Sequence, residues 1–273
     1  MTAAAGQGRF RGKRALVTGG AGFIGSTLAI RLVEEGAEVT IADAMLPEYG
    51  GNLFNLEPVR DQVRINYCDV RDEHLMALMV EGMDYVFHLA AQVSHVKSLS
   101  DPYPDIDINI KGTVALMEAV RKVNPRAVVV RSGTRGEYGA AAKLPVSEEA
   151  PTHPRGLYEI SLLTSEKILL MYHEVHGIPV VHLRVTNTYG PRAQMKSPHY
   201  GVANWLIRLA LDGRPIIGPI SDVAGLWVCA GHGPWGISTG PGSSRLVVSQ
   251  MLGLGEAGQP PEFSPARFAH DPA

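Results

Sequence analysis

The stretch that decides the fold is Leu16-Val17-Thr18-Gly19-Gly20-Ala21-Gly22-Phe23-Ile24-Gly25. An apolar strand, expected over Arg14–Thr18, runs directly into glycines spaced three apart and then into a helix expected over Ser26–Glu35. Such glycines allow positive φ, close backbone approach to a pyrophosphate and tight packing of helix on strand. Because the motif has its strand and its helix, it favours a dinucleotide site over a plain turn. The cofactor contacts expected here are Gly19, Gly22, Phe23, Ile24 and Gly25.

Strand-like and helix-like segments alternate from about residue 14 to residue 187. The strand-like runs are short and almost continuously apolar, which is typical of strands buried on both faces of a parallel sheet. A helix is expected over Gly112–Val123, where Val114, Met117 and Val120 recur at helical spacing. The alternation predicts a doubly wound, Rossmann-like α/β sheet. The strands expected after Arg14–Thr18 are Glu38–Asp43, Arg64–Val70, Asp84–Ala90, Arg126–Ser132 and Val180–Asn187.

The bulk composition excludes several classes of protein. The chain has 273 residues, 45% of them apolar, with a net charge of −2, which argues against nucleic-acid or polybasic membrane binding. The only cysteines, Cys68 and Cys229, match no metal spacing, and no metal site is expected. We read no signal peptide in residues 1–12 and no run long enough for a membrane span. A cytoplasmic location is therefore expected.

The composition changes near residue 213. Residues 218–242 are dense in Gly, Pro and Trp, and residues 258–273 are rich in Pro, with one possible helix over Ser243–Leu254 between them. We therefore predict a dinucleotide-binding domain over residues 12–212 and an atypical tail over residues 213–273.

Asp43 ends the second expected strand, about 20 residues after the glycine loop. An acidic side chain at this position takes the ribose hydroxyls of the adenosine and repels a 2′-phosphate, so NAD is favoured over NADP. A strand-end aspartate that merely caps a turn is the alternative.

At this point the chain resembles the extended short-chain dehydrogenase/reductase family, especially its NAD-dependent nucleotide-sugar epimerases and dehydratases. The resemblance covers about residues 12–217 and implies NAD as cofactor, a nucleotide sugar as substrate and a homodimer formed through helices that include the one bearing Tyr158. The matching positions are the glycine loop, Asp69 and Val70 as adenine contacts, His88, Leu89, Ala90 and Ala91 along the cofactor, Asn109 in a helix, and Asn187 to Arg192 at the substrate edge.

Thr134 matches the family's catalytic Ser/Thr, because it lies four residues before Tyr138. It would hydrogen-bond the substrate oxygen, although it could also be an ordinary loop hydroxyl. The family's dehydratases carry Asp-Glu after this residue, whereas this chain has Arg135 and Gly136. Glu137 comes one position later and is expected to point elsewhere, which counts against a dehydratase.

Tyr158 and Leu162 resemble the family's catalytic Tyr-x-x-x-Lys, with Leu162 in place of the lysine. Residues four apart share a helix face, so a lysine there would lower the pKa of the phenol. Leu162 supplies no charge, and Lys167 is expected on the opposite face of the helix. Lys143 could reach the site only from a loop. The resemblance favours the catalytic role for Tyr158 over that of a plain core tyrosine, with turnover strongly reduced or absent.

The tail resembles a different family. Residues 225–242, with Gly231-His232-Gly233, and residues 265–268 are similar to the C-terminal end of flavin-dependent D-amino-acid-oxidase-like proteins, over about residues 211–273. The rest of such an oxidase is missing, so a fusion remnant is favoured over a working flavin site. His232 has no evident partner ligands and is taken as a loop histidine.

Three functions remain open. The first is an impaired NAD-dependent nucleotide-sugar epimerase, with Asn187 and Arg192 at the substrate. The second is a catalytically inactive NAD-binding module, and the third is an FAD-dependent oxidase suggested by the tail alone.

Overall fold

The computed structural model describes residues 8–47, 49–141 and 143–195, Asn204, Ile207, Arg208, and the strands β7 and β8. The chain divides into two compact units, Met1–Gln194 and Met195–Ala273, and each is described by itself.

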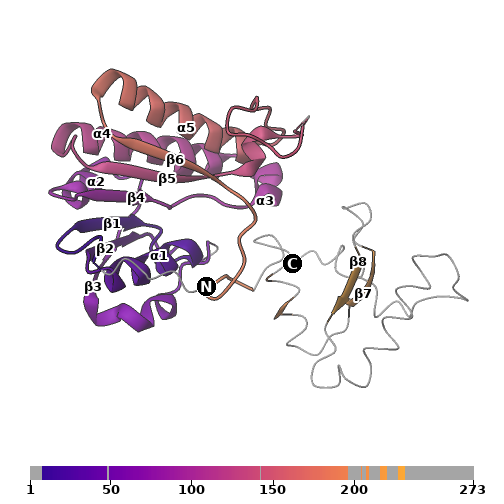
Figure 1. Cartoon of the computed structure of the whole chain (residues 1–273), viewed down its shortest axis with the longest axis horizontal. Coiled ribbons are helices and arrows are strands. Elements are labelled where there is room, and N and C mark those ends of the chain that lie inside the picture. The colour runs from indigo at the N-terminus through magenta and orange to yellow at the C-terminus, as the bar shows by residue number, and fades with distance from the viewer. Residues whose placement is uncertain are drawn as a thin grey trace, which may run out of the picture. The chain divides into compact units, whose positions relative to one another are not determined.

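The first unit is built on a six-stranded parallel sheet (Figure 1). The strand order is β3-β2-β1-β4-β5-β6, so the order reverses between β1 and β4. In such sheets ligands bind outside the carboxyl ends of the strands at this reversal. The doubly wound prediction is confirmed. The strands are β1 (Arg14–Thr18), β2 (Glu38–Asp43), β3 (Val63–Tyr67), β4 (Tyr85–His88), β5 (Val128–Thr134) and β6 (Val180–Val185).

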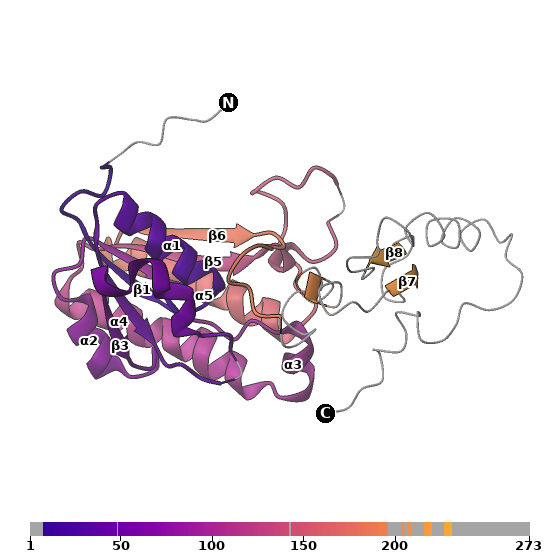
Figure 2. The same ribbon diagram turned by 90° about the horizontal axis from the view of Figure 1, so that it is seen from below.

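Helices cover both faces of this sheet (Figures 1 and 2). One face packs against α2, α4 and α5, and the other packs against α1 and η1. The helices are α1 (Phe23–Glu34), η1 (Leu53–Gln62), α2 (Glu73–Val80), α3 (His95–Ser100), η2 (Asp105–Lys111), α4 (Gly112–Val123), η3 (Arg135–Tyr138) and α5 (Leu157–His176).

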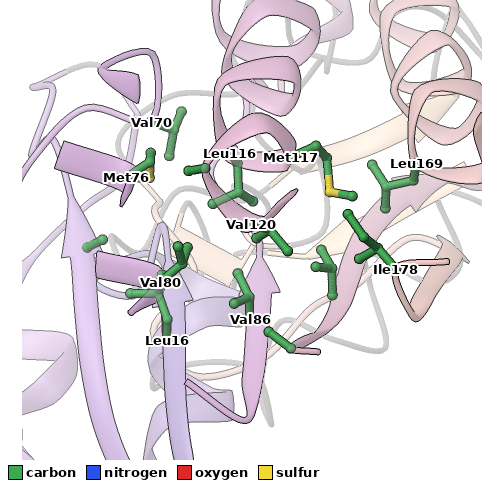
Figure 3. Close-up of a cluster of buried hydrophobic side chains, with 14 of the residues drawn as sticks. Leu16, Val70, Met76, Val80, Val86, Leu116, Met117, Val120, Leu169 and Ile178 are labelled. Carbon is green, nitrogen blue, oxygen red and sulfur yellow. The ribbon is translucent and has the colours of Figure 1, made fainter. Parts of the chain in front are cut away.

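The larger core lies between the sheet and α2, α4 and α5 (Figure 3). Apolar side chains of the strands meet those of the helices, and the central ones are completely buried. Burying each side chain of this size contributes about 2 kcal/mol. This core fixes the positions of α4 and α5 over the sheet. Its most buried members are Leu16, Met76, Val80, Val86, Leu116, Met117, Val120, Leu169 and Ile178.

The expected elements agree with the structure most closely in the first half of the sheet. Arg14–Thr18, Glu38–Asp43 and Gly112–Val123 have the predicted bounds. The third, fourth and sixth strands end before the predicted bounds, because the residues after Tyr67, His88 and Val185 leave the sheet. The fifth strand instead runs two residues further, to Thr134. The helix after the glycine loop begins at Phe23, three residues earlier than predicted.

The described part of the second unit contains an antiparallel pair, β7 (Ile216–Pro219) with β8 (Trp227–Ala230). The helix predicted over Ser243–Leu254 and the side chain of His232 lie outside the described residues. The domain boundary at residues 212 and 213 stays a prediction. Among the described helices none is long and apolar enough to cross a membrane.

Candidate active site

The glycine loop between β1 and α1 is so closely packed that Gly19 and Gly25 have no space for a side chain. Gly19 has φ +66°, and a Cβ there would lie 2.8 Å from the backbone nitrogen of Ala90. A Cβ at Gly25 would overlap the carbonyl oxygen of Gly19, and the nitrogen of Gly22 donates to that oxygen at 3.1 Å. Gly22 caps α1 with extended backbone, so the first N–H groups of the helix open toward the loop. This cradle fits the pyrophosphate of a dinucleotide.

Asp43 lies at the carboxyl end of β2 and braces the loop. Its Oδ2 accepts from the nitrogen of Ala21 at 3.0 Å, and its Oδ1 accepts from the nitrogen of Met45 at 2.9 Å. Each carboxylate oxygen has a second lone pair, so the bracing leaves capacity for ribose hydroxyls. The bond to Met45 is the turn cap that the sequence offered as the alternative role of Asp43, whereas the bond to Ala21 depends on the folded loop and was not predicted.

The residues predicted along the cofactor follow the ends of the neighbouring strands. Leu89 and Ala90 both donate from their nitrogens to Thr18 Oγ1, at 3.1 and 3.2 Å, and Ala91 is partly exposed after them. His88 Nδ1 lies 3.0 Å from the same hydroxyl. Burial, with a smaller effect of the Arg131 charge, holds the pKa of His88 well below its ordinary value. His88 is therefore neutral, and it links β4 to the adjacent strand β1 through Thr18.

Asp69 and Val70 follow β3, as expected for residues beside an adenine. Val70 is buried, while the Asp69 carboxylate accepts from Arg71 Nε at 2.9 Å and Nη2 at 2.6 Å. These hydrogen bonds lower the pKa of Asp69 despite its partial burial. Phe23 is partly exposed and Ile24 exposed at the start of α1, beside the loop.

Thr134 and Tyr158 come together at the carboxyl end of β5. Thr134 is the last residue of β5, Tyr158 lies in the first turn of α5, and the Thr134 hydroxyl is close enough to the phenol to affect its pKa. Burial is the main cause that raises the pKa of Tyr158 to about 12, and the charge of Glu159 adds to it. The Thr134 hydroxyl and the charge of Arg131 act in the opposite direction. The phenol is thus placed for proton transfer but is held protonated.

No lysine within the described residues replaces the charge missing at Leu162. Leu162 is 2% exposed and belongs to the buried face of α5. Lys167 has an exposed side chain whose Nζ lies 3.5 Å from Glu166 Oε1, and Lys143 is exposed in a loop. Both observations fit the expectation that neither lysine serves Tyr158.

A buried polar network supports the helix that bears Tyr158. Asn109 Nδ2 donates to Ser161 Oγ at 2.9 Å, and Ser161 Oγ donates to the carbonyl of Tyr158 at 2.8 Å. Asn109 Oδ1 also accepts from the nitrogen of Gln92, whose side chain donates to Asp105 at 2.9 Å. The sequence predicted Asn109 but missed Gln92, Asp105 and Ser161. Isolated polar residues carry no periodic signal from which such a network could be found.

Glu137 points into the protein rather than toward a substrate. It is completely buried, and Oε1 accepts from the nitrogen of Thr134 at 2.8 Å. His182 Nε2 lies 3.2 Å from Oε1, and Arg184 Nε donates to Oε2 at 3.1 Å. A Cβ at Gly133 would overlap both Glu137 and His182. Complete burial and these three partners hold the Glu137 carboxylate inside the protein, which does not fit the exposed acid that a dehydratase needs.

Glu166 completes this ion network. Arg184 donates to its two oxygens at 2.8 and 2.7 Å, which opposes the effect of burial and lowers the pKa of Glu166. Ligand atoms of Glu137, Glu166 and His182 lie within 4.8 Å of one another, a spacing that a metal could use. Arg184 already supplies the positive charge between the two carboxylates, so the cluster is complete as an ion network.

The segment expected at the substrate edge follows β6. Asn187 is exposed, and its Oδ1 accepts from Arg135 Nε at 3.4 Å. Arg192 has φ +71°, and its carbonyl accepts from Asn55 Nδ2 at 3.5 Å. Asn187 and Arg192 thus lie after the carboxyl end of β6, on the same edge of the sheet as Thr134.

The family of the chain follows from this arrangement and from its sequence relatives. The model of the NAD dependent epimerase/dehydratase family matches residues 15–221. The chain belongs to this family. The match includes the glycine loop, Thr134, Tyr158 and Asn187, and NAD is the cofactor of the family.

Similar proteins include epimerases and dehydratases. The chain is 35% identical to UDP-glucose 4-epimerase of Mycolicibacterium smegmatis over 93% of this chain and 87% of that protein. The structure of UDP-glucose 4-epimerase from Thermotoga maritima with UDP-glucose matches with a TM-score of 0.68 and 32% identity, over 74% of this chain and 64% of that one. dTDP-glucose 4,6-dehydratase from Streptomyces venezuelae with NAD bound matches with a TM-score of 0.68 and 29% identity, over 74% and 63%.

Coverage differs among these relatives. Other curated relatives are matched over 51% to 65% of their length, so the chain spans about half to two thirds of them. The part of the chain that carries the family resemblance is the sheet with its glycine loop and the β5–α5 residues.

Proposed function

We propose that the chain is an NAD-dependent epimerase that acts on a nucleotide sugar and whose proton transfer is weakened by Leu162. The observation that carries the proposal is the shared edge of the sheet: the glycine loop follows β1, and Thr134 and Tyr158 lie together at the end of β5. The epimerases of Mycolicibacterium smegmatis and Thermotoga maritima support the choice of reaction. The burial of Glu137 between His182 and Arg184 supports an epimerase over a dehydratase.

The chemistry that a bound NAD would supply is reversible hydride transfer with a sugar carbon. Tyr158 Oη, as the phenolate, accepts the proton of the sugar hydroxyl in the oxidation and gives it back in the reverse step. Thr134 Oγ1 holds the same sugar oxygen. Asp43 and the glycine loop hold the nucleotide of the cofactor, while Asn187 and Arg192 lie at the substrate edge.

The protonation of Tyr158 limits this chemistry. With a pKa of about 12, on the order of one phenol in 100,000 is ionised at pH 7. Turnover is therefore expected to rise about tenfold per pH unit up to the highest pH at which the protein stays folded. A flat profile between pH 7 and 10 would contradict Tyr158 as the base.

The decisive experiment compares UDP-glucose epimerisation by the unmodified chain, Tyr158→Phe and Leu162→Lys, with NAD binding measured by calorimetry. We expect all three to bind NAD, Tyr158→Phe to lose turnover, and Leu162→Lys to raise turnover by about a hundredfold. Thr164→Lys, at a partly exposed position of the same helix, is the matched control and should change nothing. NAD binding with an unchanged rate in Leu162→Lys would contradict this assignment of the site.

A second candidate is a catalytically inactive NAD-binding module. Leu162 and the high pKa of Tyr158 favour it, because both remove the base that the reaction needs. It predicts NAD binding without turnover on any nucleotide sugar, even at high pH. Epimerisation that depends on Tyr158 would exclude it.

The flavin-oxidase resemblance of the tail stays a prediction. The match with the Mycolicibacterium smegmatis epimerase covers 93% of the chain and so extends beyond residue 217, which supports a tail of epimerase descent. A thermal-shift titration with FAD beside NAD tests it. Stabilisation by FAD would favour the flavin reading, and stabilisation by NAD alone would favour the epimerase.

We also propose that the chain forms the homodimer implied by its family resemblance. Apolar side chains on α4 and α5 support it, since Val114, Ile160 and Met171 are exposed. Sedimentation should show a dimer that Met171→Glu dissociates and that Leu78→Glu, at an exposed position of α2, leaves intact. A monomer in the unmodified chain would contradict this.

A further inference from the structure

One buried cation in the β5–α5 region has no role in the function proposed above. Arg131 in the middle of β5 has no exposed surface, and its Nη2 donates to Ser165 Oγ at 3.4 Å. Its Nε and Nη1 are buried without a hydrogen-bond partner. Leaving charged N–H groups in this state costs more than a hydrogen bond contributes, so such a residue calls for an explanation.

The register of the sheet directs Arg131 toward α5. Arg131 lies opposite His88 of β4 and His182 of β6, and paired residues of parallel strands point to the same face. His88 Nε2 lies 3.2 Å from Thr113 of α4, which identifies this face as the one covered by α4 and α5. The guanidinium therefore lies between the sheet and α5.

On α5 the guanidinium meets the face that bears the tyrosine. Tyr158, Leu162 and Ser165 are four and then three residues apart, so they share one face of the helix. Leu162 and Ser165 are both buried, and Ser165 is the residue that Arg131 contacts. A lysine at position 162 would present its charge to this same space from the helix, whereas Arg131 presents a charge to it from the strand.

We propose that Arg131 is a positioning residue that supplies, from β5, the positive charge that the family's lysine supplies from α5, and so stabilises the phenolate of Tyr158. This inference rests on the proposed function, because it assigns Tyr158 the role of base. The charge replaces one task of the lysine only, since a buried guanidinium held by Ser165 is not placed to bind a cofactor hydroxyl.

The charged groups around the phenol agree with this role. Glu159, paired with His95 of α3 at 2.8 Å, and the buried Glu137 of η3 both raise the pKa of Tyr158. Arg131 is the cation that lowers the pKa of Tyr158. Burial lowers the pKa of Arg131 itself to about 10, and the charges of Glu137 and Tyr158 oppose that effect. On the β6 side, Arg184 and His182 are bonded to Glu137 and Glu166, so their charges are engaged there.

A purely structural role is the competing explanation. The charge of Glu137 acts on Arg131, so Arg131 could serve only to balance the ion network of Glu137 and Glu166. In that case its removal changes the stability of the chain and leaves the ionisation of Tyr158 unchanged. The two roles therefore differ in a property of Tyr158 that does not depend on turnover.

The test measures the pKa of Tyr158 in the full chain by ultraviolet difference titration, with the signal of Tyr158→Phe subtracted. We expect Arg131→Met to raise this pKa by about one unit and Arg131→Lys to leave it close to the unmodified value. Leu162→Lys added to Arg131→Met should lower it again, because a charge from either element suffices. Urea denaturation of each variant reports whether it is folded.

The result that overturns the proposal is an unchanged pKa of Tyr158 in Arg131→Met. If Arg131→Met does not fold, Leu162→Lys is compared with the double variant Arg131→Met/Leu162→Lys. A double variant that folds, with a Tyr158 pKa near that of the unmodified chain, supports the proposal. A double variant that stays unfolded overturns it. NAD binding and epimerisation are measured separately. Their loss with an intact pKa shift would contradict the proposed function and leave the assignment of Arg131 standing.

Discussion

The two ends of the site hold their groups in different ways. Around β1 and α1 the cradle is made of backbone: glycines allow positive φ and close approach, and the Asp43 side chain accepts from the loop's own N–H groups. Around β5 and α5 the groups are side chains, and a buried network of Glu137, Glu166 and Arg184 lies beside Tyr158. The comparison teaches that the geometry of the cofactor end is set by the backbone conformation of its glycines, whereas that of the catalytic end is set by interactions between charged side chains.

Gly19→Ala is the substitution with the largest expected effect, and it tests the backbone conformation of the glycine loop. The new Cβ meets Ala90 at φ +66°, so we expect a loss of about 3 kcal/mol in the free energy of unfolding and a loss of NAD binding. Gly177→Ala is the matched control, with φ +70° and open space around its Cβ, and should cost about 1 kcal/mol. Urea denaturation measures both. Equal losses would show that close approach to Ala90 is unimportant.

Glu137→Gln tests the buried ion network around β5 and α5. It removes a buried charge that His182 and Arg184 face, and we expect a loss of about 2 to 3 kcal/mol in the free energy of unfolding. NAD affinity should change little, because the cradle is built from other elements. Glu149→Gln, at an exposed position, should lie within about 0.5 kcal/mol of the unmodified chain. A large loss of NAD affinity in Glu137→Gln would show that the two ends are not independent.

The smallest expected effect concerns Glu118 of α4, the helix that packs beside α5 on the same face of the sheet. A hydrogen bond from Arg121, with a second from Tyr172, lowers the pKa of Glu118 to about 2. A carboxylate with a lowered pKa contributes stability above its ordinary value of 4.5, and this contribution is lost as pH falls toward 2. Because the pair is partly exposed and screened, we expect Glu118→Gln to cost about 1 kcal/mol at pH 7. The cost should vanish near pH 2 in acid denaturation curves, and a cost independent of pH would contradict this origin.

The parts of the fold that the sequence predicted are those that depend on local pattern. The bounds of β1, β2 and α4 follow from apolar runs and helical spacing, and they agree with the structure. The strands β3, β4, β5 and β6 end elsewhere than predicted, because contacts with segments distant in the sequence determine where they end. Thr134 continues β5 beside Val185 of β6, a pairing that no local pattern encodes.

The sequence by itself determined the cofactor cradle, the family and the absence of a lysine at position 162, because glycine spacing and a residue's identity are local facts. Only the tertiary structure brought Arg131 against the face of α5 that carries Leu162, gave Glu137 its buried partner His182 and made Asp43 a brace of the loop. These outcomes depend on strand register and on helices packing over a sheet. Both join residues that are far apart in the chain, so no window of the sequence contains them.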